Sequence, residues 1–145
     1  MELRILDERI GTEFDLPKFA TEGSAGLDIR AMLHEELVLH PRMDYLIPSG
    51  IALSMDYGIA GLLIPRSSWG IKGLVLTNSV GLIDSDYQGM IRMMCRNLGE
   101  NPIIIQPGDR IMQILFVDFF QPTLEIVDKF SKETGRNIGG FGSTG

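Results

Sequence analysis

Short apolar runs separated by turn residues recur along the whole chain. The run Leu37–Leu39 ends at a His-Pro pair, Ile103–Ile105 ends at a Gln-Pro-Gly turn, and the longer run of residues 111–120 stops at Gln-Pro. With 17 glycines and 7 prolines as punctuation, this spacing is typical of the many short strands of a β-sandwich or barrel. Only residues 67–72 could hold a brief helix. The pattern therefore predicts an all-β fold.

The C-terminal segment differs in pattern from the rest of the chain. Residues 131–145 read SKETGRNIGGFGSTG, so they have little to bury and should be mobile when alone. Arg136 supplies a cation there, and Phe141 stands between glycines, where an aromatic ring can lie on a ligand. The length of 145 residues suits one domain. We predict a single β domain over residues 1–130 and a flexible lid segment over residues 131–145.

The charge of the chain narrows the class of ligand. A formal net charge of −6 argues against a nucleic-acid polymer as partner, because proteins that bind such polymers present a basic face. A phosphate-bearing ligand must then be held by a few local cations and backbone amides. A small nucleotide meets this condition better than a polymer does.

Cysteine content and hydropathy bear on the cellular compartment. Cys95 is the only cysteine, which excludes an intrachain disulfide and a thiolate metal site. It alternates with Ile91 and Met93, so we interpret it as a core residue. The opening residues MELRILDERI lack the apolar run of a signal peptide, and no stretch is apolar enough to cross a membrane. We expect a cytoplasmic protein with no membrane partner.

The segment GLIDSDYQG, residues 81–89, is the most informative part of the sequence. Asp84 and Asp86 flank a serine, and Tyr87 follows directly. A carboxylate beside an aromatic ring on a turn can activate water next to a stacked sugar or base. Aspartate and glycine are also ordinary turn formers, and for this segment alone that interpretation is favoured.

Three further places carry groups that suit phosphate or metal chemistry. The Arg66-Ser67-Ser68 segment follows an apolar run, and its guanidinium and hydroxyl donors can bind phosphate oxygens. Asp109 and Arg110 could pair across a turn that leads to Gln113, another phosphate donor. Asp28 stands inside an apolar strand pattern, where it either faces solvent or holds a metal-bound water. Each of these features, taken alone, is more typical of ordinary surface loops.

Five segments follow one another in the chain. They are SAGLD at residues 24–28, PRSS at 65–68, GLIDSDYQG at 81–89, GDRIMQ at 108–113 and RNIGGFGSTG at 136–145. In order and spacing they resemble the five motifs of the trimeric dUTPase family, over nearly the whole chain. The resemblance implies a jelly-roll-like β fold (a dUTPase-like β-clip) and a homotrimer whose active sites are shared between subunits. It also implies hydrolysis of dUTP to dUMP and pyrophosphate with Mg²⁺ bound to the triphosphate.

By this resemblance the third motif supplies the catalytic and base-reading groups. Asp84 is the general base that deprotonates the water attacking the α-phosphorus. Tyr87 packs under the deoxyribose and leaves no space for the 2′-hydroxyl of UTP. Such a site rejects cytosine, whose exocyclic amine meets the wrong partners. The uracil edge is read by the side chain of Asn78 and the backbone of Gly81, Leu82 and Ile83.

The resemblance assigns the phosphates and the metal to the other motifs. Asp28 positions Mg²⁺ through water, while the triphosphate provides the direct metal ligands. The C-terminal segment is a lid that orders on the substrate and excludes water, with its phenyl ring stacked over uracil. The triphosphate is contacted by Arg66, Ser67, Ser68 and Gln113. The substrate-binding residues of the lid are Arg136, Phe141, Gly142, Ser143 and Thr144, of which the arginine and the two hydroxyl residues hold the γ-phosphate.

Two stretches depart from the usual family pattern. Trp69-Gly70-Ile71-Lys72 stands where a small apolar pair is more common, which bears on the phosphate pocket. Asn137 stands where glycine is typical, which bears on the lid.

Two other functions are compatible with parts of the pattern. The stretch RSSWGIKG, residues 66–73, resembles the arginine-serine loop of the dCTP deaminase family. Those enzymes need a glutamate where this chain has Met94, and without it water cannot be activated at the pyrimidine ring. A nucleotide-responsive module that regulates a protein partner could keep all five motifs, although the sequence has no long insertion between motifs that would favour it.

Overall fold

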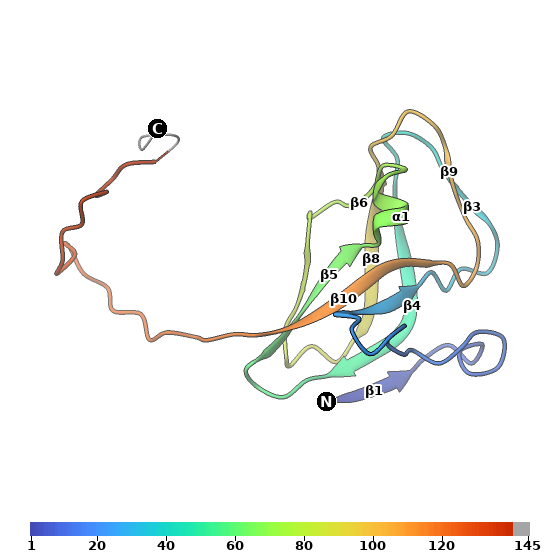
Figure 1. The fold of residues 1–145 in the computed structure, drawn as a ribbon, viewed down its shortest axis with the longest axis horizontal. Coiled ribbons are helices and arrows are strands. Elements are labelled where there is room, and N and C mark those ends of the chain that lie inside the picture. The colour runs from blue at the N-terminus through green and yellow to red at the C-terminus, as the bar shows by residue number, and fades with distance from the viewer. Residues whose placement is uncertain (141–145) are drawn as a thin grey trace.

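Two four-stranded antiparallel sheets and a two-stranded ribbon make up the fold of residues 1–140, which are the residues that the computed structural model describes (Figure 1). The first sheet has the strand order β1-β4-β8-β6. Its strands are β1 (Glu2–Ile5), β4 (Asp44–Ser54), β8 (Met90–Asn97) and β6 (Leu74–Leu76).

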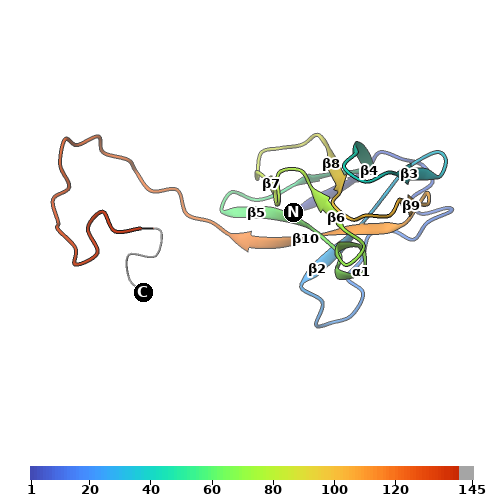
Figure 2. The same ribbon diagram turned by 90° about the horizontal axis from the view of Figure 1, so that it is seen from above.

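The second sheet carries most of the predicted site residues and has the strand order β2-β10-β5-β7. In Figure 2, β5 and β10 run side by side, as their continuous antiparallel register requires. The ribbon pairs β3 with β9. The prediction of an all-β fold is therefore confirmed. The bounds are β2 (Gly26–Arg30), β5 (Ile59–Pro65), β7 (Gly81–Ile83), β10 (Arg110–Asp118), β3 (Leu37–Leu39) and β9 (Ile103–Ile105).

One continuous apolar core joins residues of both sheets. In β8 every second side chain is buried, so that Ile91, Met93 and Cys95 face the core. Leu63 of β5 and Ile114 of β10 belong to the same core from the other sheet. Burial raises the pKa of the Cys95 thiol to about 12, so the thiol stays neutral and unreactive near pH 7. The prediction that Cys95 is a core residue is confirmed.

The local predictions agree with the structure except at one strand end. Strands β3 and β9 coincide with the two short apolar runs, and the brief helix is α1 (Ser67–Gly70), a single turn. The run of residues 111–120 was expected to form a strand throughout, but β10 ends at Asp118. Asp118 pairs with Ile59, the first residue of β5, so the neighbouring strand offers no further residues beyond this point.

Residues 119–140, which we call the C-terminal arm, extend away from the two sheets and contain no strand or helix (Figures 1 and 2). Five large apolar side chains on the arm are 85–101% exposed: Phe120, Leu124, Ile126, Phe130 and Ile138. Covering such side chains is favourable by about 25 cal/mol per Å² of apolar surface. The arm is therefore suited to contact another molecule. The division of the chain at residue 131 stays a prediction.

Within residues 1–140, no helix has the length and apolar character needed to span a bilayer.

Candidate active site

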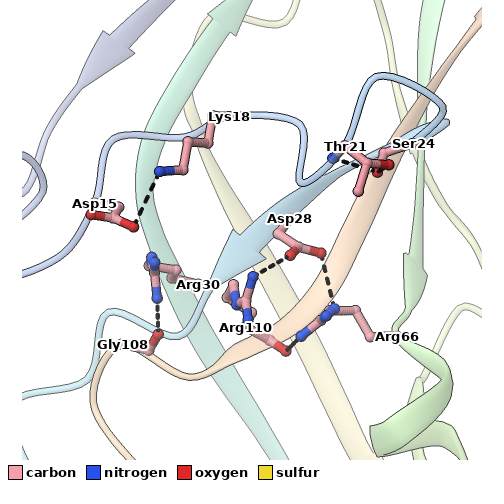
Figure 3. Close-up of polar contacts among 9 residues, drawn as sticks. All are labelled: Asp15, Lys18, Thr21, Ser24, Asp28, Arg30, Arg66, Gly108 and Arg110. Carbon is pink, nitrogen blue, oxygen red and sulfur yellow. Dashed lines mark hydrogen bonds and ion pairs between the residues drawn. The ribbon is translucent and has the colours of Figure 1, made fainter.

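Asp28 joins two arginines from distant parts of the chain into what we call the Asp28 cluster (Asp28, Arg66 and Arg110; Figure 3). Its Oδ1 lies 2.9 Å from Nε of Arg66, and its Oδ2 lies 3.1 Å from Nη1 of Arg110. The Asp28 side chain is only 14% exposed, whereas those of Arg66 and Arg110 are 30% and 46% exposed. The carboxylate thus holds two guanidinium groups side by side while both remain accessible to a ligand.

Backbone contacts fix Arg66 on the start of β10. Its Nη1 donates to the carbonyl oxygen of Arg110 at 3.1 Å, and its backbone N–H donates to that of Ile111 at 3.0 Å. Helix α1 begins at the next residue and exposes Ser67 and Ser68. The predicted phosphate-binding segment therefore lies beside the Asp28 cluster.

The residues at 69–72, which depart from the usual family pattern, fix the segment that carries Ser67 and Ser68 to the body of the protein. Trp69 is 8% exposed and belongs to the core, so it anchors α1 to the body of the protein. The Lys72 ammonium group lies 4.3 Å from the centre of the indole ring, at cation–π distance. A buried tryptophan in this place positions the two serines through the helix that carries all three residues.

Gln113 lies next to the cluster because β2 and β10 pair Asp28 with Gln113. Its Nε2 is 3.5 Å from the carbonyl oxygen of Pro65, at the end of β5. A Cβ atom at Gly26 would approach Oε1 of Gln113 to 2.4 Å. Gly26 therefore leaves the space in which the Gln113 amide lies.

Arg110 is a site residue that the sequence analysis did not select. The suggested pair between Asp109 and Arg110 does not form: Oδ2 of Asp109 accepts a hydrogen bond from the backbone N–H of Gln106 at 2.8 Å. Arg110 bonds instead to Asp28, 82 positions away in the sequence. The only sequence signal for Arg110 was its place in the same motif as Gln113.

The second group of predicted residues lies on residues 78–89, which comprise β7 and the turn after it and which we call the Asp84 hairpin. The backbone N–H of Tyr87 donates to the carbonyl oxygen of Asp84 at 3.1 Å, and that of Met55 donates to Ser85 at 3.3 Å. Asp84 is exposed at this turn. It lines an open cavity of about 770 Å³ together with Met55, Tyr57, Ala60, Leu82, Ser85, Asp86, Phe119 and Gln121.

The residues predicted to read the base and Tyr87 belong to the same hairpin. Gly81, Leu82 and Ile83 form β7, which pairs with Gly61–Leu63 of β5, and Asn78 is exposed just before it. The Tyr87 ring is 45% exposed, and its hydroxyl donates to the carbonyl oxygen of Met90 at 3.0 Å. Asp84, Tyr87 and Asn78 are therefore presented together, at the two ends of one short strand.

The Asp28 cluster and Asp84 lie at opposite ends of β5. Asp84 is one residue beyond the Gly61–Ile83 pair, level with Ala60, whereas Arg66 follows Pro65 at the other end. Six residues of extended strand span about 20 Å. One chain therefore does not bring its predicted base and its predicted phosphate-binding arginine, Arg66, together.

The part of the lid that the structure describes contains Arg136. Its Nε donates to the carbonyl oxygen of Gly139 at 2.9 Å, within the arm itself. Asn137 has a φ of 43°, in the left-handed region that asparagine tolerates better than most residues. Asparagine can therefore replace the usual glycine at this position. Four predicted lid residues lie outside the described residues: Phe141, Gly142, Ser143 and Thr144.

The donor set around Asp28 suits a metal that is carried by the substrate. Within residues 1–140 there is no group of three or more His, Cys, Asp or Glu side chains placed to hold a metal ion. Mg²⁺ keeps several waters and is usually bound through one or two carboxylates together with phosphate oxygens. Asp28 supplies one carboxylate beside Arg66 and Arg110, whose guanidinium groups could bind phosphate, so the residues present fit such a shared site.

The all-β body carries paired guanidinium groups at one end of β5 and the exposed carboxylate of the Asp84 hairpin at the other. These groups are typical of an enzyme that acts on a small phosphorylated substrate. The sequence model of the dUTPase family matches residues 12–145. The chain belongs to the dUTPase family.

Full-length relatives share this assignment. The deoxyuridine 5'-triphosphate nucleotidohydrolase of Pseudomonas paraeruginosa is 50% identical over 147 residues, covering 100% of this chain and 97% of that protein. The protein of the same name from Shewanella pealeana is also 50% identical, with 100% and 96% covered. The chain is therefore an enzyme of this family along its whole length.

Solved structures share the fold. The dUTPase of Staphylococcus bacteriophage 80alpha, solved with dUpNHpp, has a TM-score of 0.82 at 26% identity and covers 99% of this chain and 97% of its own. A mutant dUTPase from phage phi11 of S. aureus, which has a structural Mg(II) ion, has a TM-score of 0.77 at 25% identity, with 90% and 98% covered. The dUTPase-like β fold implied by the sequence is confirmed.

Proposed function

We propose that this chain hydrolyses dUTP to dUMP and pyrophosphate, with Asp84 as the general base. The observation that carries the proposal is the exposed carboxylate on the Asp84 hairpin, beside the strand that is predicted to read uracil. Membership in the dUTPase family supports the substrate and the reaction. The deaminase alternative lacks a carboxylate at Met94, and this side chain is 40% exposed on the outer face of β8.

The reaction breaks the bond between the α-phosphorus and the oxygen that bridges to the β-phosphorus. Asp84 takes a proton from water as the water oxygen bonds to the α-phosphorus, and pyrophosphate leaves with the bridging oxygen. Catalysis of this kind depends on placing the water in line and on stabilising the charge of the phosphates. Tyr87 packs under the deoxyribose, and Asn78 with the backbone of β7 reads the uracil edge.

The triphosphate lies on the Asp28 cluster and the residues beside it. Arg66 and Arg110 each present a guanidinium group that Asp28 holds in place, and forked donors of this kind suit phosphate oxygens. Ser67, Ser68 and Gln113 add neutral donors. Asp28 would help to hold Mg²⁺, and the metal, when bound, would neutralise charge on the phosphates.

The active site is shared within a homotrimer. The separation of about 20 Å along β5 supports this proposal. A complete site needs both the Asp84 hairpin and the Asp28 cluster, so one copy of the chain must supply the hairpin and another copy the cluster. Contacts between unlike surfaces close into a ring when the rotation between copies allows it. The C-terminal arm, with its exposed apolar side chains, reaches a neighbouring copy and delivers the lid residues beyond Thr134.

Substrate selectivity can be measured with four nucleotides. In the presence of Mg²⁺, dUTP is expected to give dUMP and pyrophosphate, whereas dCTP, dTTP and UTP should react at least about a hundredfold more slowly. Chelation of the metal should stop turnover. Separation of products by chromatography checks both outcomes. A deaminated product from dCTP would support the deaminase instead, and no turnover at all would support the nucleotide-responsive module.

A shared site predicts complementation between two inactive variants. Arg66→Ala removes a phosphate contact and Asp84→Asn removes the base, so each variant alone should be nearly inactive. In trimers assembled from equal amounts of the two variants, about one site in four combines an intact hairpin with an intact cluster from the neighbouring copy. Mixing by denaturation and refolding should therefore restore about a quarter of wild-type activity.

The double variant, with both substitutions in one chain, is the control for this mixing. It should stay inactive after refolding with either single variant. In each of these mixtures every chain carries the same one of the two substitutions, so no site can combine an intact hairpin with an intact cluster. Refolded mixtures with no gain over the separate single variants would show that each site lies within one chain.

A further inference from the structure

Gly89 lies against the hydroxyl end of the Tyr87 ring. A Cβ atom built on Gly89 would lie 2.6 Å from the hydroxyl oxygen of Tyr87, 2.7 Å from Cζ and 3.0 Å from Cε2. Real side chains essentially never approach so closely. The space that the ring occupies therefore exists only because residue 89 has no side chain.

The backbone of Gly89 does not itself require glycine. Its φ lies outside the left-handed range, unlike those of Gly58, Gly73 and Gly108. Alanine would fit this backbone without strain, so the contact with Tyr87 is what excludes a larger residue. The contacted atoms are at the free end of a side chain, which can move without unfolding the protein.

A hydrogen bond holds the ring in the same place. The Tyr87 hydroxyl donates to the carbonyl oxygen of Met90 at 3.0 Å, one residue after Gly89. The hydroxyl end of the ring thus rests on the turn, while 45% of the residue stays exposed. The absence of a side chain at Gly89 therefore allows the hydroxyl end of the ring to lie where it does.

We propose that Gly89 is a positioning residue that sets the place of the Tyr87 ring and so determines the discrimination between dUTP and UTP. The inference rests on the proposed function, in which Tyr87 packs under the deoxyribose. A methyl group at residue 89 drives the ring toward the sugar or sideways. Movement toward the sugar weakens binding of dUTP, and movement sideways makes room for a 2′-hydroxyl. Movement toward the sugar also hinders UTP, so the preference for dUTP falls through the sideways movement, which admits the 2′-hydroxyl.

The test is the ratio of kcat/KM for dUTP to that for UTP in Gly89→Ala. We expect the ratio to fall about tenfold or more, since small displacements of a positioning group have effects of this size. The change should appear in KM rather than in kcat, because Asp84 keeps its place on the hairpin. Gly23→Ala is the matched control, since a Cβ there meets nothing within 4 Å and its φ is also ordinary.

A second background shows whether Gly89 acts through the ring. In Tyr87→Ala, the further change Gly89→Ala should alter the ratio by less than about twofold, because the contact no longer exists. An equal further loss in that background would overturn the proposal, and so would an unchanged ratio in folded Gly89→Ala. If Gly89→Ala does not fold, the same substitution is compared with its parent in Tyr87→Phe, whose ring lacks the hydroxyl but keeps the atoms Cζ and Cε2 next to residue 89. An equal ratio in these two proteins also contradicts the inference.

The wild-type protein separates this inference from the proposed function. Failure of the unmodified chain to hydrolyse dUTP, or equal turnover of dUTP and UTP, would contradict the proposed function. Selectivity in the wild type together with an unchanged ratio in Gly89→Ala would contradict only the role of Gly89 and would leave the proposed function standing.

Discussion

Asp84→Asn is expected to lower kcat for dUTP by about a thousandfold, the size of loss that removal of a general base produces. The amide keeps the shape of the side chain but cannot take a proton from the attacking water. Because Asp84 is exposed on a turn that backbone hydrogen bonds hold, the fold should not change. Steady-state kinetics give kcat, and titration with the unreactive analogue dUpNHpp should give an affinity close to that of the wild type.

Asp86→Asn is the matched comparison for this variant. It makes the same chemical change two residues along the same hairpin, and Asp86 lines the same cavity. A much smaller loss in Asp86→Asn assigns the base to Asp84. An Asp84→Asn enzyme with near-normal kcat would remove Asp84 from this role.

Removal of residues 135–145 is expected to lower kcat/KM for dUTP by about a hundredfold or more, since closure of a lid positions the substrate and excludes water. The truncated protein should keep its thermal midpoint. The hydrogen bonds of Asn137, Arg136 and Gly139 in the described part of the arm are made within the arm, so the sheets lose no support. Kinetics, thermal unfolding and size-exclusion chromatography check these outcomes.

Arg136→Ala separates the two parts of this effect. It removes the charge from the lid and keeps its length, so its loss should be smaller than that of the truncation. Full activity after truncation would contradict the lid proposal. A changed oligomeric state would instead place residues 135–145 in subunit assembly.

The five motifs were recognisable in the sequence because each consists of a few adjacent residues whose chemistry is local. The strand β2 around Asp28, the turn at Asp84 and the single turn α1 were expected from runs of apolar and turn-forming residues. The burial of Cys95 followed from its alternation with Ile91 and Met93 in β8. The end of β10 was predicted too late, because that end depends on where its partner β5 begins.

The contacts between motifs were not predictable in the same way. Asp109 and Arg110 are neighbours and suggested a local pair, yet Arg110 bonds to Asp28. That bond requires β2 and β10 to lie next to each other, with a register shift between Arg110 and Met112. A residue pattern along one strand does not specify which strand will be its neighbour or in what register.

The sequence by itself determined the all-β fold, the core face of β8 and the chemical types of the site residues, since these depend on the side chains and their spacing along the chain. Only the tertiary structure decided how those residues are grouped. It joined Asp28, Arg66 and Arg110 into one cluster and placed Asp84 at the far end of β5. The physical reason is that strand pairing and register arise from packing of the whole core, in which residues far apart in the sequence become neighbours.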